Sequence, residues 1–258
     1  MLLALAGGLA VGLLMGALGG GGAILAIPLL VYGFGFTPTQ ATLASLVVVG
    51  IGASTGVVTQ ARSVDWRRGA LFGALGLAGA YGGRVLAHGI DGQLLLLAFS
   101  VLLLVVASLM VRAARRGSIR AQSADAASRP SAFRQGLALV GAATGVGFLT
   151  GFFGVGGGFA IVPALTLILG LSMATAVGTS LLVILINSFV ALALGVGALP
   201  SLDWSALAPL LATTVVGTLA GTWGGRRVPQ RSLQLAFAIF LYVVAAYMAA
   251  TTLIELMA

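Results

Sequence analysis

Long stretches without any charged side chain are the feature that most constrains this chain. Met1 to Ala61 contains none, and neither does Gln135 to Leu202. Shorter uncharged stretches cover Gly92 to Val111 and Ser232 to Ile254. A helix needs about 20 consecutive apolar residues to cross the hydrocarbon core of a membrane. These stretches therefore predict several membrane-spanning helices.

The composition excludes a water-soluble domain. Hydrophobic residues make up 60% of the chain and charged residues only 7%, whereas soluble domains carry about 25% charged residues. Open strands cannot cross lipid because their main-chain polar groups would stay unpaired. The apolar runs also lack the alternation of an outer-membrane barrel. We therefore expect an all-α polytopic membrane protein.

The charges and breaks divide this chain into expected segments. A first membrane repeat covers 1–112, a polar, Arg-rich cytoplasmic linker covers 113–133, and a second membrane repeat covers 134–258. Each repeat would contain about four to five membrane segments. The expected helices cover 2–18, 23–33, 38–60, 68–88, 92–112, 135–153, 158–170, 172–196, 204–225 and 233–256.

The two halves of the chain repeat one another. Two glycine-rich motifs, Gly16 to Gly22 followed by Pro28 and Gly151 to Gly158 followed by Pro163, match at one constant offset, which also pairs Ser45 with Ser180. Farther along the chain, Asp65-Trp66 matches Asp203-Trp204, and Gly82-Gly83-Arg84 matches Gly224-Gly225-Arg226. The halves are therefore homologous.

The arginines predict how the halves lie in the membrane. If both halves had the same orientation, four arginines would lie opposite Arg62 and the linker: Arg84, Arg226, Arg227 and Arg231. If the halves were inverted, only Arg84 would lie opposite the others. Because arginine accumulates in cytoplasmic loops, we expect inverted repeats with both termini outside. Glycine-rich segments 2–33 and 135–170 would then be re-entrant hairpins or broken helices, as in inverted-repeat transporters.

Two glycine-rich turns inside the apolar stretches form the candidate substrate site. Consecutive glycines weaken a helix by about 1 kcal/mol each relative to alanine, and a helix break within a membrane is tolerated where it lines a protein-enclosed cavity. The next helix begins with free N–H groups and a positive dipole end, which bind an anion without a charged side chain. Close helix packing is the alternative role. The candidate glycines are Gly19, Gly20, Gly21, Gly22, Gly154, Gly156, Gly157 and Gly158.

Polar side chains in the charge-free helices are further candidates for substrate contact. Serine and threonine in such helices often bond a main-chain carbonyl instead, but Ser45 and Ser180 are related by the repeat. Asparagine is costly to bury and needs a partner. The candidates are Ser45, Ser180, Thr42, Thr179 and Asn187.

Prolines and arginines mark the ends of the predicted segments. Pro28 and Pro163 indicate helix breaks, as helix starts or kinks. Arg84 and Arg226 each follow a Gly-Gly pair at the end of a span. Snorkelling to the lipid headgroups is the favoured role of both arginines; an electropositive vestibule that attracts the anion is the alternative.

The composition also limits the chemistry. The chain has no cysteine, one histidine and five acidic residues. We therefore expect no metal site, no cofactor and no enzymatic activity, because paired carboxylates and nucleophile–base sets are lacking. The net charge is +8. The arginines that cause it lie between apolar runs and not in a basic patch with interleaved aromatics, so we expect no nucleic-acid partner. The expected partners are a small anion and the lipid bilayer, and homo-oligomerisation stays open.

The glycine motif is duplicated, as Gly16-x-x-Gly19-Gly20-Gly21-Gly22…Pro28 and as Gly151-x-x-Gly154-x-Gly156-Gly157-Gly158…Pro163. With these motifs, its two halves and its polar linker, the chain resembles the sulfite exporter TauE/SafE family over nearly its whole length. The resemblance implies outward transport of sulfite, a sulfonate or a related sulfur compound.

We accordingly expect a multi-pass transporter of the cytoplasmic (inner) membrane that exports a small sulfur-containing anion by alternating access. An anion channel of the same fold and a carrier of a non-sulfur organic anion stay open as alternatives. The direction of transport and the coupling ion are also open.

Overall fold

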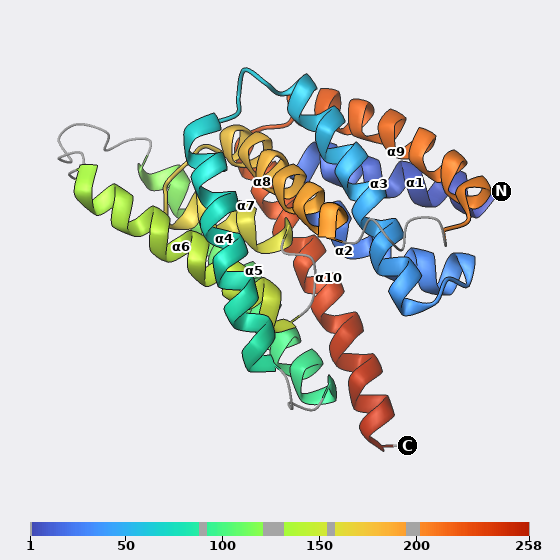
Figure 1. Ribbon diagram of the computed structural model, residues 1–258. Coiled ribbons are helices and arrows are strands. Elements are labelled where there is room, and N and C mark those ends of the chain that lie inside the picture. Colours follow the sequence, from blue (N-terminus) through green and yellow to red (C-terminus); the bar gives the residue numbers. More distant parts are fainter. Residues whose placement is uncertain (1, 88–91, 121–131, 154–157, 195–201, 258) are drawn as a thin grey trace.

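The computed structural model describes residues 2–87, 92–120, 132–153, 158–194 and 202–257. Apart from the connecting turns, these residues form α-helices and one π-helical turn (Figure 1). The prediction of an all-helical membrane protein is thus confirmed. In this part of the chain, seven helices are long and apolar enough to cross a membrane: α3, α4, α5, α6, α8, α9 and α10.

The α-helices fall into two sets of five, and the first set also contains a π-helical turn. The first set consists of α1 (Leu2–Leu18), α2 (Gly21–Pro28), η1 (Leu29–Gly33, the π-helical turn), α3 (Pro38–Thr59), α4 (Trp66–Ala87) and α5 (Gly92–Arg120). The second set consists of α6 (Ala132–Phe153), α7 (Gly158–Leu167), α8 (Met173–Leu194), α9 (Trp204–Gly225) and α10 (Gln230–Met257).

These bounds match the expected segments closely, and the differences concern helix ends. Helix α5 continues past the expected end at 112 to Arg120, so it enters the predicted linker. Helix α2 ends at Pro28 and passes directly into η1, where one continuous helix over 23–33 was expected. Helix α6 is long enough to cross a membrane, whereas α1, α2 and α7 are shorter.

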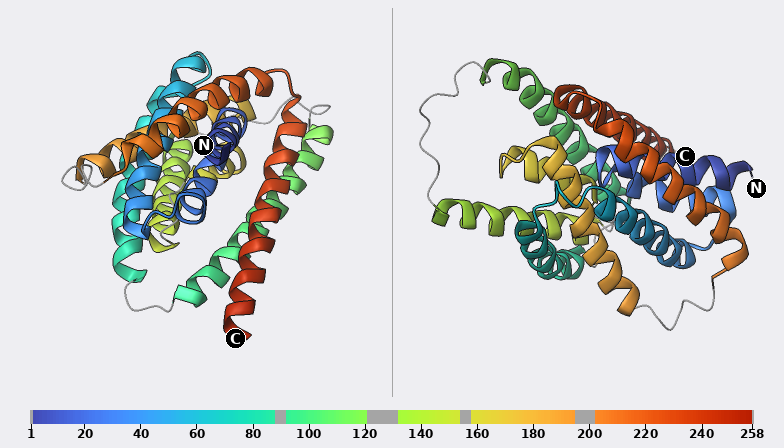
Figure 2. Two further views of the ribbon diagram at one scale, coloured as in Figure 1. Left: turned by 90° about the vertical axis from the view of Figure 1, so that its right-hand side faces the viewer. Right: turned by 90° about the horizontal axis from the view of Figure 1, so that it is seen from above.

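Each set exchanges its first helix with the other set. Helix α1 packs along α9, and α6 packs along α4, so the first helix of each set lies against the fourth helix of the other (Figure 1). The corresponding helices α5 and α10 lie side by side (Figure 2), and α3 packs against α8. The contact pattern therefore stays the same when the two sets are exchanged.

Glycines bring the exchanged helices into close contact and fix their register. Gly83 of α4 lies against the carbonyl oxygen of Phe148 in α6, and Gly221 of α9 lies against the carbonyl oxygen of Leu13 in α1. Leu13 and Phe148 occupy equivalent positions in the two halves, three residues before the first glycine of each motif. Gly83 therefore corresponds to Gly221, and the match of Gly82-Gly83-Arg84 with Gly224-Gly225-Arg226 is wrong by one helical turn.

The repeat-related helices α3 and α8 cross in opposite directions. A Cβ atom added at Gly50 would lie 3.5 Å from Cβ of Ser188, and one added at Gly56 would lie 2.6 Å from Cδ1 of Leu181. Residues nearer the end of α3 thus contact residues nearer the start of α8, so the two helices run in opposite directions. Opposite directions of equivalent helices are what inverted repeats require, so this packing favours the predicted inversion, which stays a prediction.

Equivalent caps begin equivalent helices. The Thr37 side chain and Gln40 form a capping box at the start of α3, and the Ser172 hydroxyl accepts a hydrogen bond from the Thr175 N–H at the start of α8. The Asp65 carboxylate accepts one from the Arg68 N–H at the start of α4. Side-chain oxygens at these positions satisfy N–H groups that the helix leaves unpaired.

Candidate functional site

The first glycine turn joins α1 to α2 and is buried. Gly19 has a φ of +74°, a left-handed conformation that glycine adopts without steric cost. Its N–H donates to the Met15 carbonyl at 2.8 Å and closes α1. Helix α2 begins at Gly21 without a side-chain cap at Gly20. A buried, uncapped helix start is unusual, because its first N–H groups need partners.

This turn meets the start of α7 from the second half. A Cβ atom added at Gly158 would lie 2.9 Å from the carbonyl oxygen of Gly20 and 3.0 Å from its Cα atom. The two main chains are therefore in direct contact, which only residues without side chains permit. Gly158 is the first residue of α7, so the N-terminal ends of α2 and α7 lie close together at the boundary between the halves.

The other glycines of the two motifs have different surroundings. Gly22 packs against the carbonyl oxygen of Val11 in α1, so it serves close packing. Gly21 has more room, because a Cβ atom there would lie 3.5 Å from the nearest neighbouring atom, Cε1 of Phe240. The predicted site residues Gly154, Gly156 and Gly157 lie outside the described residues.

Ser180 is the predicted polar residue that lies at the first glycine turn. A Cβ atom added at Gly19 would collide with the Ser180 Oγ atom. Ser180 is fully buried, and its hydroxyl donates to the Val177 carbonyl at 2.8 Å. The lone pairs of the hydroxyl oxygen remain able to accept a hydrogen bond. Ser45, its counterpart, donates in the same way to the Thr42 carbonyl at 2.7 Å.

Thr42, Thr179 and Asn187 lie elsewhere. Thr42 is exposed on α3. Thr179 is buried and accepts a hydrogen bond from the Asp65 N–H at 3.0 Å, so it holds the α3–α4 connection against α8. Asn187 lines a separate cavity between α4, α6, α7 and α8. The structure therefore brings only Ser180, among the candidate polar residues, to the described glycine turn.

The two candidate vestibule arginines occupy exposed positions near the ends of α6 and α1. Gly83, next to Arg84, contacts Phe152, near the end of α6. Gly225, next to Arg226, contacts Ala17, near the end of α1, with 3.3 Å between an added Cβ atom and Cα of Ala17. The Arg226 guanidinium donates a hydrogen bond to the Thr59 carbonyl at the end of α3.

Neither proline begins a helix. Pro28 is the last residue of α2, where the helix passes into η1. Pro163 lies inside α7 and is buried. Since proline lacks an N–H group, each leaves one carbonyl of the preceding turn without its usual helical partner.

Sequence reasoning missed Gln60 as a residue of this region. Its side chain is 6% exposed, and its Nε2 atom donates to the Gly16 carbonyl at 3.3 Å. This hydrogen bond ties the end of α3 to the last turn of α1, just before the glycine turn. A glutamine at the end of an apolar helix is a recognisable signal, because a buried amide needs hydrogen-bond partners.

Among the described residues, no three side chains able to bind a metal ion gather into a site. Helices α2, α7 and α8 contain no charged residue. Any ligand at the meeting point of α2 and α7 would therefore be held by main-chain N–H groups, hydroxyls and helix dipoles.

Comparison with known proteins gives a consistent result. The model of the family described as "Sulfite exporter TauE/SafE" matches residues 4–248. Proteins named "Probable membrane transporter protein" from Xylella fastidiosa strains Temecula1 and 9a5c are each 40% identical over 181 residues, covering 69% of this chain and 67% of theirs. No solved structure matches the chain significantly.

Proposed function

The chain belongs to the sulfite exporter TauE/SafE family of membrane transporters, and from this premise we propose that it exports a small sulfur-containing anion, such as sulfite or an organosulfonate, across the cell membrane by alternating access. It works without a cofactor, a metal ion or a chemical reaction. The binding region is formed by the starts of α2 and α7 and by Ser180.

The observation that carries this proposal is the uncapped, buried start of α2 in contact with the start of α7. Main-chain N–H groups at a helix start, together with the helix dipole, stabilise negative charge. In an uncharged, low-dielectric environment this stabilisation is stronger than in water. An anion between the two helix starts would accept hydrogen bonds from the first N–H groups of α2, for which Gly20 supplies no side-chain cap.

The charge distribution agrees with an anionic substrate. Apart from Glu255 near the end of α10, the described helices contain no acidic residue, while Arg84 and Arg226 lie near the ends of α6 and α1. Such charges raise the local concentration of an anion at a pathway entrance. Snorkelling toward headgroups does not conflict with this role, because both require the guanidinium to be near the membrane surface.

Flux through purified protein tests this proposal. Proteoliposomes would be loaded with unlabelled sulfite and given external [³⁵S]sulfite; parallel samples would use an alkyl sulfonate, sulfate or acetate. Saturable, counterflow-stimulated exchange of sulfite or the sulfonate, absent from protein-free liposomes, is the expected result. A current linear in voltage without counterflow would instead identify a channel. Exchange of acetate alone would contradict the sulfur-anion substrate.

A further inference from the structure

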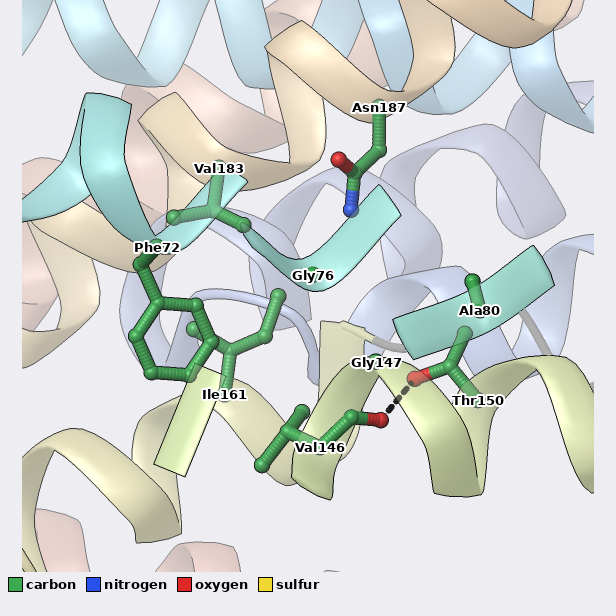
Figure 3. A pocket seen from close by; sticks show the side chains of 9 residues that line it. All are labelled: Phe72, Gly76, Ala80, Val146, Gly147, Thr150, Ile161, Val183 and Asn187. Atoms are coloured by element: carbon green, nitrogen blue, oxygen red, sulfur yellow. Dashed lines mark hydrogen bonds between the residues drawn. The ribbon is translucent and has the colours of Figure 1, made fainter. Parts of the chain in front are cut away.

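An open groove runs along an exposed face of α5. It has a volume of about 290 Å³ and is lined by Val101, Leu104, Val105, Ser108, Leu109 and Arg112. The cavity that Asn187 lines has only about 20 Å³, which is too little for an organic ligand (Figure 3). Helix α5 lies at the side of the molecule and packs mainly on α10, so it leaves this face uncovered (Figure 2).

The middle of the groove offers only apolar surface. Its four aliphatic side chains are 39–59% exposed. The Ser108 hydroxyl donates to the Leu104 carbonyl at 2.7 Å and is also hydrogen-bonded to the Tyr242 hydroxyl of α10 at 2.7 Å. Since its proton is used within α5, Ser108 accepts the proton of Tyr242. The serine thus serves the contact between the two helices, and the groove suits a hydrocarbon chain.

A single cation, Arg112, lies at one end of the groove. It is exposed and forms no ion pair within the described residues. The uncharged stretch 92–111 ends directly before it, so the guanidinium lies at the level of the lipid headgroups. An apolar surface that ends in a cation at the membrane boundary is complementary to a lipid with an anionic headgroup.

The groove has the length of one lipid leaflet. Val101 and Arg112 are eleven residues apart, which corresponds to about 16 Å along a helix. The hydrocarbon core is about 30 Å thick, so each leaflet contributes about 15 Å. The groove therefore extends from the headgroup level to the middle of the bilayer, as an acyl chain does.

The equivalent face of α10 has the same apolar stripe but lacks the cation. The two helices align by three pairs of residues that are each at most 1% exposed: Phe99 with Phe237, Leu103 with Leu241 and Ala107 with Ala245. In this register the exposed Ile239 and Val243 correspond to Val101 and Val105. Ala250 takes the place of Arg112. Charge therefore distinguishes the α5 face from an ordinary lipid-facing surface.

We propose that the groove binds one acyl chain of an anionic phospholipid and that Arg112 pairs with the phosphate of its headgroup. The planar guanidinium matches phosphate oxygens with two parallel hydrogen bonds. A zwitterionic headgroup carries a cation of its own, which Arg112 repels. A second copy of the chain fits less well, because a two-fold axis along the membrane normal would bring Arg112 of both copies together.

Native mass spectrometry of the purified protein with equimolar phosphatidylglycerol and phosphatidylcholine of identical chains tests this site. We expect one phosphatidylglycerol to be retained several-fold more often than phosphatidylcholine. Arg112→Gln should remove most of this preference, and Arg112→Lys should keep it. The matched control is Arg115→Gln, because Arg115 is exposed one turn farther along α5 and does not line the groove. This control should leave the preference unchanged.

Filling the groove separates it from the charge. Val105→Trp occupies the groove and leaves Arg112 in place, so retention of both lipids should fall several-fold. Equal retention of the two lipids by the parent protein, unchanged retention in Val105→Trp, or equal loss of preference in Arg112→Gln and Arg115→Gln would overturn the proposal. A lipid-free dimer that Val105→Trp dissociates would also overturn it, in favour of a second copy on this face.

Discussion

The guanidinium of Arg226 donates a hydrogen bond to the main-chain carbonyl of Thr59. This contact places the end of α9 beside the end of α3, just before Arg62. If the two halves had the same orientation, these helix ends would lie on opposite membrane surfaces. The hydrogen bond therefore favours inverted halves, as does the antiparallel packing of α3 on α8.

Cysteine labelling would decide the orientation. The chain has no cysteine, so single-cysteine variants need no altered background. Inversion predicts that an impermeant maleimide added to intact cells labels Arg84→Cys, but labels Arg62→Cys and Arg231→Cys only after permeabilisation. Labelling of Arg231→Cys from the outside would show halves of the same orientation.

Adjacent glycines in α4 give a matched test of the packing between α4 and α6. A Cβ atom at Gly83 would lie 2.7 Å from the main-chain nitrogen of Phe152, whereas one at Gly82 would meet nothing within 4 Å. We expect Gly83→Ala to lower the free energy of unfolding by about 1–3 kcal/mol. Gly82→Ala should be neutral or stabilising by up to about 1 kcal/mol. Denaturant titration in micelles measures both, and equal effects would refute the close packing.

The conformation of Gly19 can be separated from its contact with Ser180. Gly19 and Gly35 both have positive φ, +74° and +69°, but a Cβ atom at Gly35 would meet nothing. Gly35→Ala should therefore cost only the backbone strain, about 1–2 kcal/mol. Gly19→Ala should cost more, and Ser180→Ala in the same chain should restore part of the difference. A purely additive double variant would mean that the two residues do not interact.

Arg226 distinguishes a vestibule from a simple membrane anchor. We expect Arg226→Gln to raise KM for the transported anion by roughly two- to tenfold at unchanged maximal rate, because a nearby charge mainly concentrates the anion. Arg226→Lys should keep a KM near that of the parent protein, and the difference should shrink at high salt. An unchanged KM in Arg226→Gln would leave membrane anchoring as the role of this arginine.

Most of the fold could be predicted from the sequence because charges and glycines mark the helix ends. The expected bounds of α1 and α9 agree with the structure to the residue, since the Gly19 turn ends one helix and Asp203 precedes the other. The arginines after Val111 predict an end of α5 at 112, but arginine is a good helix former, and the helix continues to Arg120.

The arrangement of polar residues could not be predicted, because it depends on contacts between the halves. Thr179 looked like a candidate for substrate contact, but its hydroxyl accepts from the Asp65 N–H. Asn187 needed a partner, but only the packed helices show that it faces a cavity. The register of Gly83 against α6 was also invisible, because Gly82-Gly83 matches Gly224-Gly225 in the sequence, whereas Gly83 packs as the isolated Gly221 does.

Transport by a glycine variant at the meeting point of α2 and α7, with a glycine variant outside it as control, tests the central claim most directly. An added Cβ atom at Gly20 would collide with the main chain of Gly158, while one at Gly82 of α4 would meet nothing within 4 Å. In folded, monodisperse proteins reconstituted at equal density, we predict that Gly20→Ala reduces saturable [³⁵S]sulfite or sulfonate exchange about tenfold or more, as expected when about 1–3 kcal/mol of overpacking separates the helix starts. Gly82→Ala should retain exchange near that of the parent protein. Normal exchange by a folded Gly20→Ala protein would contradict an anion pathway at the meeting point of α2 and α7.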